Sequence, residues 1–174
     1  MALRPIRSHG SVLVLGGTGS IGQWAAGWAV MLGAARTVYV DRDEESRGLA
    51  EGYGATAVAS LDELDRADAF DVLIDASAHA GRLADGIGRL GVGGHCHSVG
   101  IYFEPTTGLP LGSMYMNGIS FSTGRPSVSL VLGEVLLAVA EYRFDPSPVF
   151  SDRLPFDDAA SALAELPRKA VFVR

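Results

Sequence analysis

A glycine-rich turn directly after a short apolar run constrains the fold of this chain more than any other stretch. Residues 12–22 read V-L-V-L-G-G-T-G-S-I-G, so that Gly17, Gly19 and Gly22 form the pattern G-x-G-x-x-G. In this pattern the first glycine permits a tight turn, the second lets the backbone approach a pyrophosphate, and the third lets a helix pack closely on a strand. The N–H groups and the dipole at the start of the following helix favour phosphate. Alone, the stretch also fits a glycine-rich turn in another α/β protein.

Apolar runs and helical patterns alternate along the rest of the chain. The predicted strands are 11–15, 37–40, 55–58, 71–74, 95–99, 118–122 and 170–173. The predicted helices are 21–32, 43–53, 62–67, 80–90, 127–141 and 157–166, with a loop over 102–112. Alternation of this kind is typical of βαβ units. We therefore expect an α/β, three-layer Rossmann fold, with a doubly wound parallel sheet of about six strands in the order 3-2-1-4-5-6 and a single domain over residues 1–174.

Charge and composition exclude several classes of function. The formal net charge of −6, without a basic face, does not suit nucleic acid. Cys96 is the single cysteine, so an internal disulfide is excluded and a reducing cytoplasm is expected. The first ten residues lack the apolar core of a secretory signal. The apolar run over 128–140 is too short to span a membrane and predicts a buried helix instead.

An acidic residue ends the second predicted strand. Asp41 follows the glycines by about twenty residues, where a carboxylate accepts hydrogen bonds from an adenosine ribose and repels a 2′-phosphate. This position favours NAD over NADP, although Arg42 and Arg47 soften the preference. The alternative interpretation of Asp41 is a solvated carboxylate at the end of a strand.

Five segments together resemble one family. They are V-L-V-L-G-G-T-G-S-I-G (12–22), M-L-G-A (31–34), V-D-R-D-E-E-S-R-G-L-A-E-G-Y-G-A-T (40–56), F-D-V-L-I-D-A-S (70–77) and L-G-V-G-G-H-C-H-S-V-G (90–100). Their order and spacing resemble the C-terminal coenzyme-binding domain of the medium-chain dehydrogenase/reductase family, which includes the zinc-dependent alcohol dehydrogenases. The resemblance implies a cofactor site that comprises Gly17, Thr18, Gly19, Ser20, Ile21, Gly22, Asp41, Arg42, Ser77, Val99, Gly100 and Ile101. Of these, residues 99–101 would offer backbone groups to the nicotinamide carboxamide.

The chain also departs from that family. Its members begin with a GroES-like catalytic domain, which carries zinc ligands or other substrate contacts, and we expect that domain to be absent here. With one cysteine the chain lacks a structural zinc lobe, and no zinc is expected. Ala78 replaces a glycine that commonly follows the fourth strand in the family. The resemblance further implies a homodimer through edge strand 118–123, and a substrate site supplied by loops or by a separate catalytic chain.

A second family shares the opening turn. G-G-T-G-S-I-G is similar to the loop of short-chain and epimerase-like enzymes, which use Tyr-x-x-x-Lys. Lys169 is the only lysine, and Glu165 stands four residues before it, so that chemistry is excluded as usually built.

Candidate catalytic residues follow the fourth strand. Ser77 and His79 are expected to face the nicotinamide side of the crevice, where His79 is a candidate general base. The alternative role of Ser77 is to cap the helix from Ala80, and that of His79 is a polar loop residue at the start of this helix. In H-C-H (95–97), strand alternation places His95 and His97 on one face and Cys96 on the other, and two histidines make a poor zinc site.

The sequence therefore favours an NAD(H)-binding coenzyme domain of an alcohol-dehydrogenase-like oxidoreductase, acting in hydride transfer where a substrate site is supplied. The alternative is a non-enzymatic dinucleotide-binding or redox-sensing module, or a remnant without activity.

Overall fold

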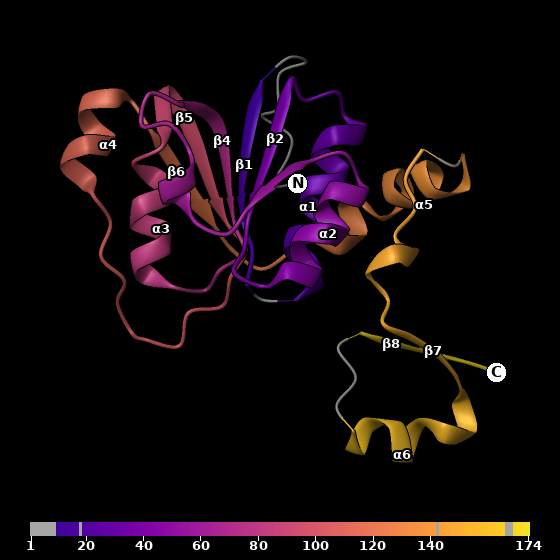
Figure 1. Cartoon of the computed structure of the whole chain (residues 1–174). Helices are drawn as coiled ribbons and strands as arrows, with labels where there is room; N and C mark the ends of the chain where they lie inside the picture. Colours follow the sequence, from indigo (N-terminus) through magenta and orange to yellow (C-terminus); the bar gives the residue numbers. More distant parts are fainter. Residues whose placement is uncertain (1–9, 18, 142, 166–168) are drawn as a thin grey trace.

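A six-stranded parallel sheet forms the centre of the molecule (Figure 1). The computed structural model describes residues 10–17, 19–141, 143–165 and 169–174. The strands are β1 (Ser11–Leu15), β2 (Arg36–Val40), β3 (Thr56–Val58), β4 (Phe70–Asp75), β5 (Leu90–Ser98) and β6 (Ser120–Thr123). They lie in the order β3-β2-β1-β4-β5-β6, which confirms the predicted Rossmann topology.

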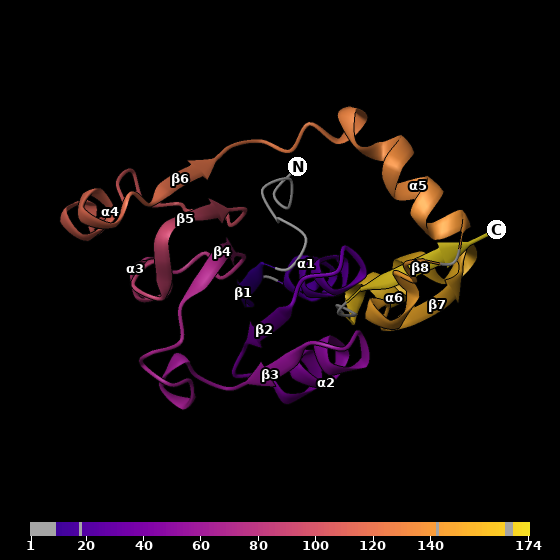
Figure 2. The same cartoon turned by 90° about the horizontal axis from the view of Figure 1, so that it is seen from above.

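Helices cover the two faces of this sheet (Figure 2). On one face lie α1 (Ser20–Met31) and α2 (Glu44–Gly52), and on the other lie α3 (Ala80–Ile87) and α4 (Leu111–Asn117). All four residues 12–15 of β1 are fully buried because the strand is covered on both sides. Leu13 and Leu15 pack in the cluster that contains Leu83 of α3, whereas Val12 and Val14 pack with the alanines of α1. The fold therefore has the three layers expected from the sequence.

The position of β1 determines where a ligand site lies. This strand pairs with β2 on one side and with β4 on the other. From β1, the strand order therefore runs to β2 and β3 on one side and to β4, β5 and β6 on the other. Ligands bind to such sheets outside the carboxyl ends of the strands at this reversal. The turns that follow β1, β2, β4 and β5 all lie at that edge.

A second, smaller sheet follows the first. After α5 (Leu132–Ala140), strands β7 (Asp152–Pro155) and β8 (Ala170–Val173) pair in parallel, with α6 (Ala159–Ala164) between them in sequence. The segment 144–150 contacts α1 and α2: the Phe144 ring lies 5.5 Å from that of Tyr53 and 5.2 Å from that of Trp28, and Trp24 Nε1 donates to the Pro146 carbonyl. The expectation of a single domain over 1–174 stays a prediction.

Several predicted boundaries are wrong. The glycines 91, 93 and 94 lie inside β5, which begins at Leu90 instead of at His95. A regular helix over 62–67 is replaced by a 3₁₀ turn at Leu61–Glu63, where Ser60 and Glu63 form a capping box. The helix predicted over 127–141 divides into a 3₁₀ turn at Val128–Leu130 and α5, since serine and β-branched valine are weak helix formers. The prediction that the run over 128–140 is a buried helix is also wrong, because Ala138 is the only buried residue of α5.

The helix predicted over 157–166 is also shorter than expected. A 3₁₀ turn occupies Phe156–Asp158, and α6 follows at Ala159–Ala164, whereas residue 166 lies outside the described residues. Helix α4 and strand β7 have no counterpart in the sequence prediction. Only Met114 of α4 is buried, so the segment carries too little apolar periodicity to be seen.

Candidate functional site

The turn after β1 adopts a conformation that requires glycine. Gly17 has φ +133° and Gly19 has φ +74°, a region that side chains with a Cβ rarely adopt. A Cβ added to Gly19 meets no described atom within 4 Å, so the backbone there faces open space. A Cβ added to Gly22 lies 3.0 Å from Tyr39 Cε2, so α1 packs directly on β2. Thr18 lies outside the described residues.

Helix α1 presents its N-terminus to this open space. Gly19 is the N-cap residue, and neither a side-chain cap nor an acidic residue in the first turn is present among the described residues. Ser20 is buried and Ile21 is about half exposed (45%) in that turn. Unsatisfied N–H groups at the start of a twelve-residue helix suit an anionic group. The donors and the open backbone at Gly19 therefore fit a phosphate.

Asp41 is buried at the end of β2. It is 6% exposed, and its carboxylate accepts from the Tyr39 hydroxyl at 2.8 Å and from the Asp43 N–H at 3.1 Å. A Cβ on Gly16 would clash with both the Tyr39 hydroxyl and the Asp41 carboxylate. Gly16, to which the sequence analysis gave no role, is thus required for the approach of β1 to β2.

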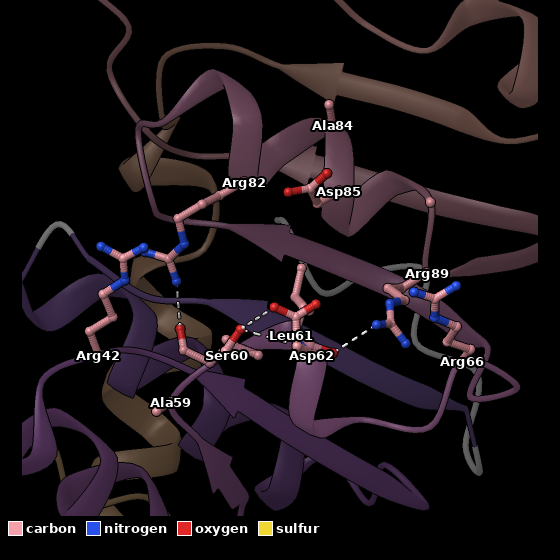
Figure 3. A pocket seen from close by; sticks show the side chains of 12 residues that line it. Arg42, Ala59, Ser60, Leu61, Asp62, Arg66, Arg82, Ala84, Asp85 and Arg89 are labelled. Carbon is pink, nitrogen blue, oxygen red and sulfur yellow. Dashed lines mark hydrogen bonds between the residues drawn. The ribbon is translucent and has the colours of Figure 1, made fainter.

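An arginine-rich pocket of about 630 Å³ opens beside the same turn (Figure 3). Its walls include Arg42, Ser60, Leu61, Arg66, Arg82 and Arg89, and we call it the arginine pocket. Arg82 joins it to the glycine turn by donating to the carbonyls of Gly16 at 2.8 Å and Val40 at 2.9 Å. Sequence reasoning included Arg42 and missed Arg82, which comes from α3.

Asp75, at the end of β4, connects the turns on the opposite side of the site. Its fully buried carboxylate accepts from the hydroxyls of Ser77 (2.6 Å), Ser98 (2.7 Å) and Tyr102 (2.7 Å). Burial, then the hydrogen bond to Asp75, raises the pKa of Tyr102 well above its usual range. The sequence signal for Asp75 was a carboxylate at the end of a mostly apolar strand, F-D-V-L-I-D.

The backbone of Asp75 holds the turn after β5. Its carbonyl accepts from the N–H groups of Val99 at 2.8 Å and Gly100 at 3.2 Å. A Cβ on Gly100 would lie 2.9 Å from Ala78 Cα, so the two turns touch. Ala78 has φ +51°, which explains why a glycine suits this position. Ile101 is largely exposed beyond this contact.

The two candidate catalytic side chains make local contacts. The Ser77 hydroxyl donates to Asp75 and accepts from the His79 N–H at 3.2 Å. His79 is the N-cap of α3, and its Nδ1 accepts from the Arg82 N–H at 3.3 Å. The capping interpretation therefore applies to His79 instead of Ser77.

An apolar pocket of about 530 Å³ lies between α1 and the segment 144–150. Its walls include Ile21 at the start of α1, Val99 after β5, and the aromatic rings of Trp24 and Phe150. Two predicted cofactor residues, one from each side of the sheet reversal, thus share this apolar surface.

The histidines of β5 lie on one face of the sheet, as predicted, while Cys96 is fully buried on the other. The Ser122 hydroxyl lies 2.9 Å from His95 Nε2 and 2.6 Å from His97 Nδ1. Burial lowers the pKa of His95, and burial together with His95 lowers that of His97. In the part of the chain that the structure describes, no three His, Cys, Asp or Glu side chains gather to hold a metal ion. None of its described helices is long and apolar enough to cross a membrane.

Comparisons with known proteins all match this chain to dehydrogenases. The family model described as zinc-binding dehydrogenase matches residues 20–127. L-threonine 3-dehydrogenase from Bacillus subtilis is 24% identical over 153 residues, which are 82% of this chain and 44% of that protein. A probable zinc-binding alcohol dehydrogenase from Mycobacterium tuberculosis is 26% identical over 162 residues, 90% of this chain and 42% of that protein.

Solved structures agree with this result. Alcohol dehydrogenase TADH from Thermus sp. ATN1 superposes with a TM-score of 0.86 at 25% identity, over 96% of this chain and 51% of that chain. Other solved structures that share the fold, at 19% and 21% identity, hold NADH in one case and NADP in another. The chain thus spans about half the length of the relatives that it matches.

Proposed function

Because the chain belongs to the zinc-binding dehydrogenase family, we propose that it binds a nicotinamide dinucleotide as the coenzyme-binding part of an alcohol-dehydrogenase-like oxidoreductase. The observation that carries this proposal is the turn at Gly17–Gly22. It combines positive φ angles, open space beyond Gly19 and a free helix N-terminus at the carboxyl end of β1. Each of these is what a pyrophosphate requires of a protein backbone.

The chain's own residues divide the dinucleotide site into three parts. The N–H groups around Ser20 and Ile21 would hold the phosphates, the arginine pocket lies toward the adenosine, and the backbone of Val99 and Gly100 lies toward the nicotinamide. When bound, the nicotinamide supplies the hydride donor or acceptor of the reaction. Asp75 keeps the turns after β4 and β5 in register by accepting from Ser77 and Ser98.

An alcohol or a carbonyl compound is the proposed substrate class. We do not assign proton transfer to Ser77 or His79, since the first donates to Asp75 and the second caps α3. Residues that position the substrate are proposed to come from loops at the same edge, or from a catalytic part beyond this chain, which spans about half of its relatives.

Two glycines that flank α1 provide a matched test. Gly19 and Gly33 both have positive φ (+74° and +81°), and an added Cβ meets no described atom at either one, but only Gly19 faces the site. Gly19→Ala and Gly33→Ala are expected to lower the free energy of unfolding by similar amounts, about 1 kcal/mol. Only Gly19→Ala is expected to weaken NADH and NADPH binding, by about tenfold or more. Quenching of Trp24 and Trp28 on the same helix measures both affinities.

The outcome for the two variants decides the proposal. Equal binding by both would mean that the turn does not hold the phosphates, and no binding by the native chain would remove the proposed function. A separate assay for alcohol-dependent NADH formation distinguishes an active oxidoreductase from a module that only binds the dinucleotide. The observation that favours the module that only binds the dinucleotide is that Ser77 and His79, the candidate catalytic residues, have structural roles.

A further inference from the structure

We propose that the arginine pocket binds a phosphate on the adenosine ribose, so that the chain prefers NADP(H) to NAD(H). This inference rests on the proposed function, because it concerns the adenosine end of the same site. Arg82 links the pocket to the glycine turn, since it lines the pocket and donates to the Gly16 carbonyl.

The charge in the pocket is positive although the whole chain is acidic. Four guanidinium groups line it together with two carboxylates, those of Asp62 and Asp85, in a chain of net charge −6. The ion pairs found among the described residues join other arginines, Arg36 to Asp68 and Arg143 to Glu141. No described carboxylate is therefore within ion-pair distance of a pocket arginine.

The arginines stand in two pairs at opposite ends of the pocket. Figure 3 shows Arg42 beside Arg82 at one end and Arg66 beside Arg89 at the other. Like charges that line one pocket repel one another, and an anion bound between them offsets this repulsion. An anion at the Arg42 and Arg82 end would lie next to the glycine turn, where the ribose must follow the pyrophosphate.

Backbone carbonyls hold one arginine of each pair in place. Arg82 donates to the carbonyls of Gly16 and Val40, and Arg89 donates to those of Leu61 (2.7 Å) and Asp65 (2.9 Å). A carbonyl orients a guanidinium without neutralising its charge. The positive charge is thus positioned before a ligand binds, which lowers the entropic cost of binding.

Asp41 opposes this preference less than the sequence suggests. Its carboxylate is 6% exposed and already accepts from the Tyr39 hydroxyl and the Asp43 N–H. It is not among the residues found to line the arginine pocket, whereas its neighbours Val40 and Arg42 are. The sequence expectation of NAD and the inference from the pocket therefore predict opposite results.

Titration of the native chain and two arginine variants tests the inference. We expect NADPH to bind about tenfold more tightly than NADH. Arg42→Ala is expected to reduce that ratio to about twofold or less. Arg66→Ala is the matched control, since it removes the same charge from the same pocket at the far end and is expected to keep most of the ratio. Adenosine 2′,5′-bisphosphate and 5′-AMP, used as competitors, repeat the comparison without nicotinamide.

Salt gives a second measurement that needs no substitution. Raising the NaCl concentration from about 0.05 M to about 0.5 M should weaken NADPH binding more than NADH binding, because the extra phosphate is held by charge. Equal affinities for the two dinucleotides, tighter NADH binding, or a ratio unchanged in Arg42→Ala would each overturn the inference while leaving the proposed function intact. If neither dinucleotide binds, both fail together.

Discussion

Asp75 is the residue on which two turns of the site depend. Three hydroxyls, from Ser77, Ser98 and Tyr102, donate to its carboxylate, which is fully buried. Asparagine keeps one accepting oxygen, and its amide nitrogen cannot accept a hydrogen bond. Asp75→Asn therefore leaves either the Ser77 hydroxyl, or those of Ser98 and Tyr102, without an acceptor. We expect this change to lower the free energy of unfolding by about 1–3 kcal/mol, measured by urea denaturation.

The control for Asp75 removes one donor and keeps the acceptor. Tyr102→Phe leaves the carboxylate with the hydroxyls of Ser77 and Ser98, so its expected cost is smaller, about 1 kcal/mol. Asp75→Asn should also weaken NADH binding more than Tyr102→Phe does, because it disturbs the side-chain contacts to Ser77 and Ser98, which stand next to the two turns of the site. An Asp75→Asn chain as stable as the native one would contradict this account.

Site features built from residues close together in sequence were predicted, whereas contacts between residues far apart in sequence were missed. The glycine turn was predicted correctly as the link between a strand and a helix, because its spacing is local. Arg82 was not, since it reaches Gly16 across 66 positions, and nothing in a single sequence marks that contact. The buried state of Asp41 likewise depends on the Tyr39 hydroxyl, which an apolar strand pattern does not reveal.

At the scale of the element, β5 presents two histidines on one face of the sheet. Burial lowers the pKa of both, so the folded chain binds protons less readily there than the unfolded chain does. The unfolded state therefore gains protons first as the pH falls below the ordinary histidine pKa of 6.5. The free energy of unfolding should be highest above that pH and should decrease as the pH falls through it toward the lower folded values.

Chemical denaturation across this pH range checks the prediction. A double variant, His95→Gln with His97→Gln, should lose most of the decrease, because glutamine does not titrate. A native chain whose stability does not change between about pH 7 and about pH 5 would contradict the prediction.

The central strands of the sheet were predictable from sequence, whereas α4 and β7 were not. Strands β1, β2 and β4 are largely apolar and mostly buried, so their order followed from the alternation with helices. Helix α4 has seven residues and β7 has four, and Pro155 ends the latter. In such short segments tertiary contacts decide the structure, and no repeating pattern records them.

At the scale of the whole molecule, β6 leaves one edge of the main sheet open. It is last in the strand order and pairs with β5 alone among the described strands. Unpaired edges invite pairing with another chain. Beside this edge, α4 exposes Tyr115 (87%) and Met116 (79%), which are large apolar side chains.

We therefore expect a homodimer formed through β6 and α4, as the family resemblance implied for residues 118–123. Sedimentation velocity should give twice the mass of 18.2 kDa for the native chain.

Tyr115→Lys combined with Met116→Lys should give a monomer, because four added charges cannot be buried across a two-fold interface. Leu32→Lys, which adds charge to an exposed leucine at the end of α1, is the control and should remain dimeric. Because Tyr115 and Met116 belong neither to the glycine turn nor to the arginine pocket, the monomer should still bind the dinucleotide. A native chain that sediments as a monomer would show that the open edge is left unpaired.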